Sequence, residues 1–258
     1  MDKVTSADGT PIAYDRLGDG PAVVLVCGGS VDRMSNAPLA ALLAENHTVY
    51  NYDRRGRGDS GDAEVYEIER EFEDLDAIFA VAGGSAHLYG TSSGAALALL
   101  ATAAGRPVNR LALWEPPYIL EGTRERPPAN TADIYREFVA AGRRDQAAEY
   151  FMAEVVGLPP EFVAMAKASP WWPAQEAIAH TLAYDATIMA DYSVPAEAVA
   201  AIAVPTQVLS GGASDEWMKL GNEAVVKLLS NGSHRTLEGQ QHNVDAAVLA
   251  PALKEFFA

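Results

Sequence analysis

The sequence of 258 residues has a single cysteine, Cys27, and no apolar run long enough to cross a bilayer. One cysteine excludes an intrachain disulfide and a cysteine-ligated metal cluster. A membrane span needs about 18 consecutive apolar residues, and the stretch from Met1 to Gly18 also lacks the apolar core of a secretory signal. We therefore expect a soluble protein in the cytoplasm, without a classical signal peptide.

Basic residues are also scarce, since 19 lysines and arginines stand against 35 aspartates and glutamates and give a formal net charge of -16. Such a field repels nucleic acid and anionic lipid, so the expected partner is a small-molecule substrate. The glycine-rich segments Cys27–Ser30 and Arg55–Gly58 match neither a P-loop nor a dinucleotide-binding motif. We expect no metal or cofactor.

Short apolar runs alternate with longer stretches of helical periodicity, a pattern typical of an α/β fold with a mostly parallel central sheet flanked by helices. Ile68 to Phe79 and Ser93 to Ala104 are predicted helices, the second rich enough in alanine and leucine to pack on the sheet. The predicted strands are Ala22–Gly29, His47–Asp53, Ala86–Gly90, Arg110–Glu115, Thr206–Gly212 and His234–Gly239.

The alternation breaks between residues 116 and 205, where paired prolines occur at Pro127-Pro128 and Pro159-Pro160 and no convincing strand is found. Several stretches there have helical character. We interpret residues 116–205 as a helical cap inserted into a core formed by residues 1–115 and 206–258.

The segment Gly90-Thr91-Ser92-Ser93-Gly94 has the pattern G-x-S-x-G between a predicted strand and a predicted helix. A sharp strand-to-helix turn holds the middle residue clear of the sheet and leaves room only for small residues two positions away on either side. Ser92 occupies that middle position, whereas Ser93 does not. Ser92 is the candidate nucleophile.

With this elbow, the chain resembles the α/β-hydrolase superfamily, in its serine hydrolase branch. Tyr52–Ser60, "YDRRGRGDS", looks like the family's D-x-R-G-x-G-x-S segment, and Val24–Ser30, "VLVCGGS", resembles its oxyanion strand and loop, with Cys27 where histidine is common. The resemblance implies an oxyanion hole formed by the backbone N–H groups of Gly29 and Ser93. A serine at the elbow disfavours the dehalogenase and epoxide hydrolase branches, which use aspartate.

A serine hydroxyl needs a base to take its proton. His242 follows the last predicted strand, where the superfamily places its catalytic histidine and where sites of α/β proteins gather. The other four histidines are less favourably placed: His47 and His87 lie in or at strands, His180 in the predicted cap, and His234 at the opposite end of the last predicted strand.

The acid that orients the base has three candidates. Asp215, in Gly212-Ala213-Ser214-Asp215, matches the G-x-x-D spacing of the family's usual acid, although it could instead cap the helix that starts near Glu216. Glu115 ends the strand after the elbow helix, a position that some family members use, and Glu216 is adjacent to Asp215. We predict the triad Ser92, Asp215 and His242, with Glu115 as the alternative acid.

The expected activity is hydrolysis of a small, mostly apolar carboxylic ester, lactone or thioester through an acyl-enzyme on Ser92. Met34, Trp171, Trp172 and Trp217 are candidates to line an apolar pocket, although each could equally pack the cap on the sheet. Arg54, Arg55 and Arg57 are either structural or a site for an anionic substrate. The same triad could serve carbon–carbon bond hydrolysis, perhydrolysis or a cofactor-free biosynthetic step, and the fold could also serve as a ligand-binding scaffold without catalysis.

Overall fold

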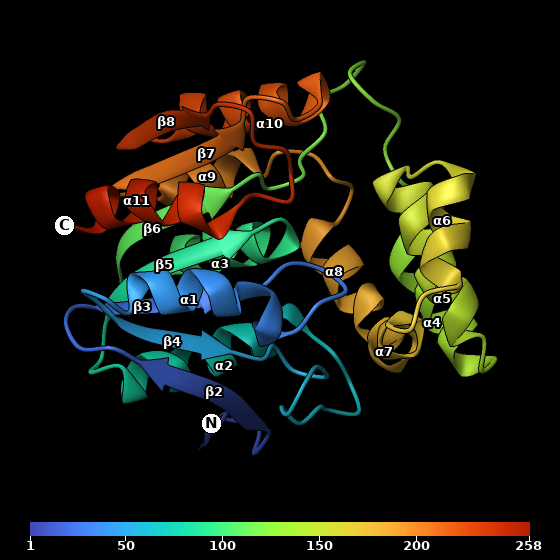
Figure 1. Cartoon of the computed structure of the whole chain (residues 1–258), viewed down its shortest axis with the longest axis horizontal. Coiled ribbons are helices and arrows are strands. Elements are labelled where there is room, and N and C mark those ends of the chain that lie inside the picture. The colour runs from blue at the N-terminus through green and yellow to red at the C-terminus, as the bar shows by residue number, and fades with distance from the viewer.

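An eight-stranded sheet organises the chain in the computed structural model, which describes all 258 residues (Figure 1). The strand order is β1-β2-β4-β3-β5-β6-β7-β8. β1 and β2 are antiparallel to their neighbours, and all the other strands are parallel. The strands are β1 (Asp2–Thr5), β2 (Pro11–Leu17), β3 (Ala22–Val26), β4 (Thr48–Tyr52), β5 (Ala86–Thr91), β6 (Val108–Trp114), β7 (Thr206–Gly211) and β8 (Gly232–Leu237).

The predicted α/β fold with a mostly parallel sheet is confirmed, and six of the strands coincide with the predicted apolar runs. The sequence did not indicate the N-terminal pair, β1 and β2. β1 is the edge strand and is largely exposed, so its residues DKVT lack the apolar run that marks a buried strand. β2 lies between β1 and β4, and only its first half is buried.

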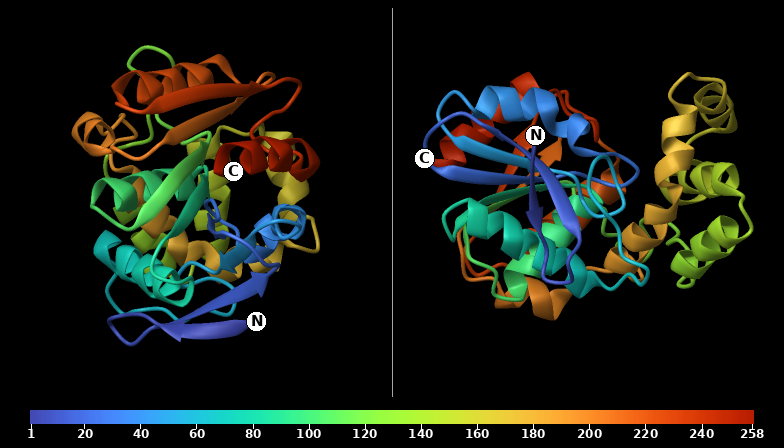
Figure 2. Two further views of the ribbon diagram at one scale, coloured as in Figure 1. Left: turned by 90° about the vertical axis from the view of Figure 1, so that its left-hand side faces the viewer. Right: turned by 90° about the horizontal axis from the view of Figure 1, so that it is seen from below.

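Helices cover both faces of the sheet (Figure 2). α1 (Ala37–Leu43) and α11 (Ala246–Phe257) pack together on one face. The other face carries α2 (Ile68–Val81), α3 (Ser93–Ala103), α9 (Ala196–Ala201) and α10 (Glu216–Leu228). α3 consists of alanine and leucine with a few serine, glycine and threonine residues, and nearly all of them are buried. They are buried because α3 packs against β5 and β6. None of the helices has both the length and the apolar composition to cross a bilayer.

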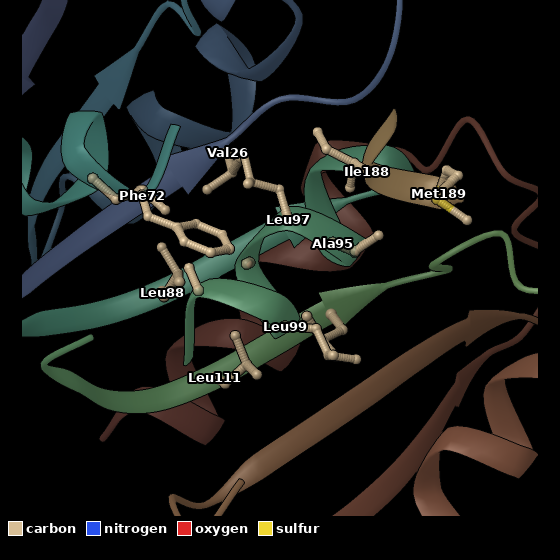
Figure 3. Packing of buried hydrophobic residues seen from close by; sticks show 14 of the residues in the cluster. Val26, Phe72, Leu88, Ala95, Leu97, Leu99, Leu111, Ile188 and Met189 are labelled. Carbon is tan, nitrogen blue, oxygen red and sulfur yellow. The ribbon is translucent and has the colours of Figure 1, made fainter. Parts of the chain in front are cut away.

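Between β6 and β7 the chain forms only helices, and we call residues 131–189 of this stretch the helical segment. Its elements are α4 (Thr131–Ala140), α5 (Arg144–Tyr150), the π-helical turn η2 (Phe151–Val156), α6 (Pro160–Lys167), α7 (Trp172–Ile178), the short 3-10 turn η3 (Ala179–Thr181) and α8 (Leu182–Met189). α4, α5 and α6 stand away from the sheet, and α8 leads back to it (Figure 1). Ile188 and Met189 of α8 lie beside Ala95 and Leu97 at the start of α3 (Figure 3).

The buried imidazole of His87 in β5 should make stability depend on pH. Its Nδ1 has no partner, and its ring stacks on Phe257 with 4.8 Å between ring centroids. Burial, with smaller contributions from His47 and Arg110, lowers the pKa of His87 from 6.5 to about 4. As the pH falls from about 6.5 to about 4, His87 of the unfolded chain binds a proton before His87 of the folded protein does. The free energy of unfolding should therefore fall, and His87 should account for up to about 3 kcal/mol of this decrease.

Denaturant unfolding of the protein and of His87→Phe at about pH 7 and pH 4 tests this expectation. The variant keeps an aromatic ring against Phe257 but has no proton to bind, so it should lose less stability than the unmodified protein on acidification. Equal losses would show that His87 contributes nothing to the pH dependence.

Candidate active site

Four candidate residues lie at the same side of the sheet, where the parallel strands end, because each follows the carboxyl end of one of these strands. β3 pairs with β4 on one side and with β5 on the other, so the strand order reverses at β3. Ligands of open α/β sheets bind at the carboxyl ends of the strands beside such a reversal. Gly29 follows β3 and Ser92 follows β5, while Glu115 follows β6 and His242 follows β8.

Ser92 lies in a strained turn between β5 and α3. Its φ of 56° and ψ of -127° are rarely adopted by a residue with a side chain, and such strain persists only where the surroundings enforce it. The Ser92 N–H donates to the Trp114 carbonyl oxygen at 2.9 Å, and the Ser92 carbonyl oxygen accepts from Ala95 and Ala96 in the first turn of α3. These bonds fix the backbone of the predicted elbow.

The two glycines of the G-x-S-x-G pattern are required by close backbone contacts. A Cβ on Gly90 would collide with the Gly94 carbonyl oxygen, and one on Gly94 would collide with the carbonyl oxygen of Cys27. The second contact brings the start of α3 against the loop after β3. The elbow and the predicted oxyanion loop therefore lie directly against each other.

His242 is paired with Glu115. Nδ1 of His242 lies 2.8 Å from Oε2 of Glu115, and the other carboxylate oxygen accepts from the Gly211 N–H at 2.7 Å. Glu115 is fully buried, whereas the His242 side chain is 41% exposed. The Trp114 indole N–H donates to the His242 carbonyl oxygen at 2.8 Å, which ties the histidine loop to β6. With Nδ1 held by a carboxylate, Nε2 is the ring nitrogen left to accept a proton.

The prediction that Asp215 holds the imidazole is wrong for this geometry. Asp215 stands at the N-cap position of α10, and its Oδ2 accepts from the Trp217 indole N–H at 3.2 Å. Glu216, the other candidate on this loop, begins α10. Glu115 reaches His242 instead because its backbone adopts a φ of 44° just after β6, and the Gly211 N–H at the end of β7 fixes its carboxylate.

The remaining histidines lie away from this pair. His47 and His87 pack around Phe257, and Nε2 of His180 lies 3.2 Å from Asp62. His234 does not open the last strand as expected but lies within β8, where Nε2 is 2.9 Å from the Ser210 hydroxyl. None of these four lines the cavity described below.

Gly29 and Ser93, the predicted oxyanion donors, lie on the two segments that meet at the elbow. Ser93 is the first residue of α3, where backbone N–H groups have no carbonyl of the helix to bind. Cys27, at the position where the family commonly has histidine, is completely buried, and its thiol lies 3.6 Å from the Val31 carbonyl oxygen. Burial raises the pKa of the Cys27 thiol, so it stays protonated and uncharged.

One cavity of about 1030 Å³ contains the proposed catalytic groups. Sixteen of its 36 lining residues are hydrophobic, so the surface offered to a ligand is mixed. The polar and charged groups that line it, besides the glycines and backbone, include Ser92, Ser93, Glu115, Arg124, Asp185, Asp215, His242 and Asp245.

Of the four predicted pocket residues, only Trp217 lines this cavity. Met34 is 60% exposed and Trp171 is 47% exposed, both outside it. Trp172 packs within the helical segment against a small cluster that includes Met152 and Val163. The prediction is therefore wrong for Met34 and Trp171, which face solvent, and for Trp172, which fills the apolar core of the helical segment.

The three arginines after β4 are structural. Arg54 pairs with Glu71 and Asp185, Arg55 with Asp74 and Asp8, and Arg57 with Asp185. All three guanidinium groups are buried, and none lines the cavity. Asp185, the partner of two of them, was not among the predicted residues. Its signal in the sequence is an acid within the apolar helix Leu182–Met189.

Comparisons with known proteins identify the family and the fold. Residues 23–248 match the profile of the Alpha/beta hydrolase family. An alpha/beta hydrolase from Sphaerobacter thermophilus superposes with a TM-score of 0.93 over 100% of both chains, at 48% identity. An enol-lactonase from Burkholderia xenovorans, at 21% identity and covered over 99% of each chain, has a TM-score of 0.72.

A sequence relative, the uncharacterized hydrolase YraK of Bacillus subtilis, is 37% identical over 95 residues, which are 35% of each chain. The chain thus matches about a third of the length of this curated relative.

Proposed function

Since this chain belongs to the alpha/beta hydrolase family and is an enzyme of that fold, we propose that it is a serine hydrolase. Its substrate would be a small, mostly apolar carboxylic ester or lactone, cleaved through an acyl-enzyme on Ser92. The observation that carries the proposal is the contact between His242 and the buried carboxylate of Glu115, two residues that line the same cavity as the strained Ser92.

The proposed chemistry gives each of these groups one role. His242 Nε2 takes the Ser92 proton as Oγ attacks the ester carbonyl carbon, and the backbone N–H groups of Gly29 and Ser93 bind the oxyanion. The imidazolium then gives the proton to the departing alcohol oxygen, which leaves the acyl group on Ser92. Water, deprotonated by His242, attacks the acyl carbon, and the acid product departs as Ser92 regains its proton.

Glu115 supports both steps without exchanging a proton. Its Oε2 accepts the Nδ1–H of His242, which fixes the tautomer with Nε2 unprotonated and stabilises the imidazolium when it forms. Full burial of the carboxylate limits competition from water. The Gly211 N–H keeps the carboxylate in place through its other oxygen.

The helical segment would act as a cap over the site. Phe151, Val155 and Leu158 from η2 and the turn after it line the cavity opposite the sheet edge, together with Met189 of α8. Such side chains suit an apolar acyl or alcohol group. Among the solved structures of this fold are an esterase from Rhodococcus and a thermophilic esterase from Thermogutta terrifontis, a fact consistent with ester substrates.

A panel of p-nitrophenyl esters of graded acyl length, run beside lactones and aryl thioesters, tests the substrate class. We expect turnover of short to medium acyl esters, with kcat/KM rising as apolar groups fill the cavity and falling when the acyl chain carries a charge. Failure of the protein to turn over any of these substrates would contradict the proposal that it hydrolyses esters or lactones. It would favour a carbon–carbon bond or perhydrolase reaction on the same triad.

A further inference from the structure

A buried carboxylate from the helical segment lies against the proposed oxyanion hole. Asp185 of α8 is 6% exposed, and each of its oxygens accepts hydrogen bonds from the core. Oδ1 accepts from Arg54 Nη1 and from the Ser93 hydroxyl, both at 2.8 Å. Oδ2 accepts from Arg57 Nη2 at 2.7 Å.

These contacts connect Asp185 to both segments that carry the proposed oxyanion donors. The link to Ser93 is direct, through its hydroxyl. The link to the loop of Gly29 runs through Arg57, whose Nη1 donates to the carbonyl oxygens of Gly28 and, at 3.2 Å, Val31. A Cβ on Gly29 would lie 3.1 Å from Asp185 Oδ2 and 3.4 Å from the Ser93 hydroxyl oxygen, so the three groups are in close contact.

The charges of the cluster balance. Arg54 also pairs with buried Glu71, through Nη2 at 2.6 Å, so two guanidinium groups face two carboxylates. Burial opposes the ionised form of Asp185, but Arg57 and Arg54 outweigh it and lower the pKa of this carboxyl. Asp185 is therefore ionised at neutral pH, and an ionised group fixed by three donors holds their geometry rigidly.

A second contact joins the helical segment to the same loop. Ser30, which follows Gly29 and has a φ of 58°, donates from its hydroxyl to Oε1 of Gln175 in α7 at 2.5 Å. The loop after β3 is thus held by α7 and, through Arg57, by α8. Neither contact involves the proposed triad.

We propose that Asp185 is a positioning residue that holds the backbone N–H groups of Gly29 and Ser93 at the spacing an oxyanion requires. Because Asp185 belongs to α8, the helical segment would then hold the oxyanion hole in place as well as cover the cavity. The inference rests on the proposed function, because it concerns the transition state of acyl transfer. A hole whose donors are misplaced binds the developing oxyanion less well while ground-state binding is unchanged, so the loss appears in kcat.

Asp185→Asn separates positioning from a simple effect of charge. Removing a negative charge beside the oxyanion hole would by itself favour the developing oxyanion and raise kcat. Asparagine keeps one acceptor oxygen and puts an NH2 group in place of the other, so it loses the bond from Arg57 or the bond from Ser93, and this loss would instead lower kcat. The charge effect therefore predicts a higher kcat for Asp185→Asn, and the positioning role predicts a lower one.

The experiment measures kcat and KM for a p-nitrophenyl ester, and the inhibition constant of an aryl trifluoromethyl ketone, whose serine adduct places an oxyanion in the hole. For Asp185→Asn we expect kcat to fall about ten- to a hundredfold with KM within about twofold, less than the loss of a whole donor. Ketone affinity should fall by a similar factor. Tyr184→Phe is the matched control: it removes the adjacent bond from α8 to Asp62, at 2.9 Å, and should leave all three quantities unchanged.

An unchanged or higher kcat in Asp185→Asn, or an equal loss in Tyr184→Phe, would overturn the proposal. If Asp185→Asn shows no cooperative thermal transition, Ser93→Ala decides instead, since it removes the bonded hydroxyl without changing charge. That variant should lose about three- to tenfold in kcat and in ketone affinity alike, and an unchanged ketone affinity would overturn the role of Asp185. Inactivity of the unmodified protein on every ester would contradict the proposed function itself. This result can be told apart from the outcomes above, which are all changes measured relative to an active protein.

Discussion

Ser92→Ala is expected to reduce ester turnover by several orders of magnitude while the protein stays folded. Without Oγ no acyl-enzyme can form, and the residual rate comes only from binding and the oxyanion donors. The Ser92 backbone bonds to Trp114 and to the first turn of α3 do not involve the hydroxyl, so the midpoint of thermal unfolding should change little. Initial rates on p-nitrophenyl acetate, with circular dichroism melting of the same samples, check both expectations.

Ser93→Ala is the matched control for this variant, because it alters the adjacent serine of the same elbow. Ser93 supplies a backbone N–H to the chemistry, and its hydroxyl only meets Asp185. It should therefore keep at least about a tenth of the activity. If Ser93→Ala lost as much activity as Ser92→Ala, the nucleophile would have to be reassigned.

Glu115→Gln is expected to lower kcat about ten-thousandfold, the loss found when the acid of a triad becomes an amide. The glutamine oxygen would remain on the Gly211 N–H, which would turn the amide NH2 toward Nδ1 of His242. Nδ1 must then be unprotonated and Nε2 protonated, so the imidazole can no longer accept the Ser92 proton. Single-turnover kinetics would place the loss in the acylation step.

Asp215→Asn is the corresponding control, and it should change kcat by less than about threefold because the carboxylate of Asp215 makes its side-chain hydrogen bond to the Trp217 indole and not to His242. The reverse pattern, with Asp215→Asn severe and Glu115→Gln mild, would restore Asp215 as the acid. If only the double variant were impaired, the two carboxylates would substitute for each other on one imidazole.

The sequence pointed to Ser92 through a local pattern and to His242 through its position after the last predicted strand. Gly90 and Gly94 flank Ser92 for reasons of backbone contact, and His242 follows the last strand. The acid could not be chosen this way. Glu115 and Asp215 follow the carboxyl ends of the adjacent strands β6 and β7, and a difference in backbone conformation, the positive φ of Glu115, decides which one reaches the imidazole.

The pocket was harder to predict for a different reason. The sequence does not tell whether a tryptophan is exposed or buried. The small apolar cluster around Trp172 forms only when α5, η2, α6 and α7 pack together. Asp185 was not predicted because its contacts are with Arg54 and Arg57, which lie more than 100 residues earlier in the chain. An acid in the apolar helix α8 was the available signal, since a charge there needs a buried partner.

Covalent labelling tests whether Ser92 is a nucleophile activated by Glu115 and His242. The protein is treated with a fluorophosphonate, its intact mass is measured, and the modified peptide is sequenced by tandem mass spectrometry. We predict a single adduct on Ser92, and labelling that slows by orders of magnitude in His242→Ala and in Glu115→Gln but not in Asp215→Asn. An adduct on Ser93, or no adduct on a protein that hydrolyses esters, would contradict the assignment of Ser92 as the nucleophile.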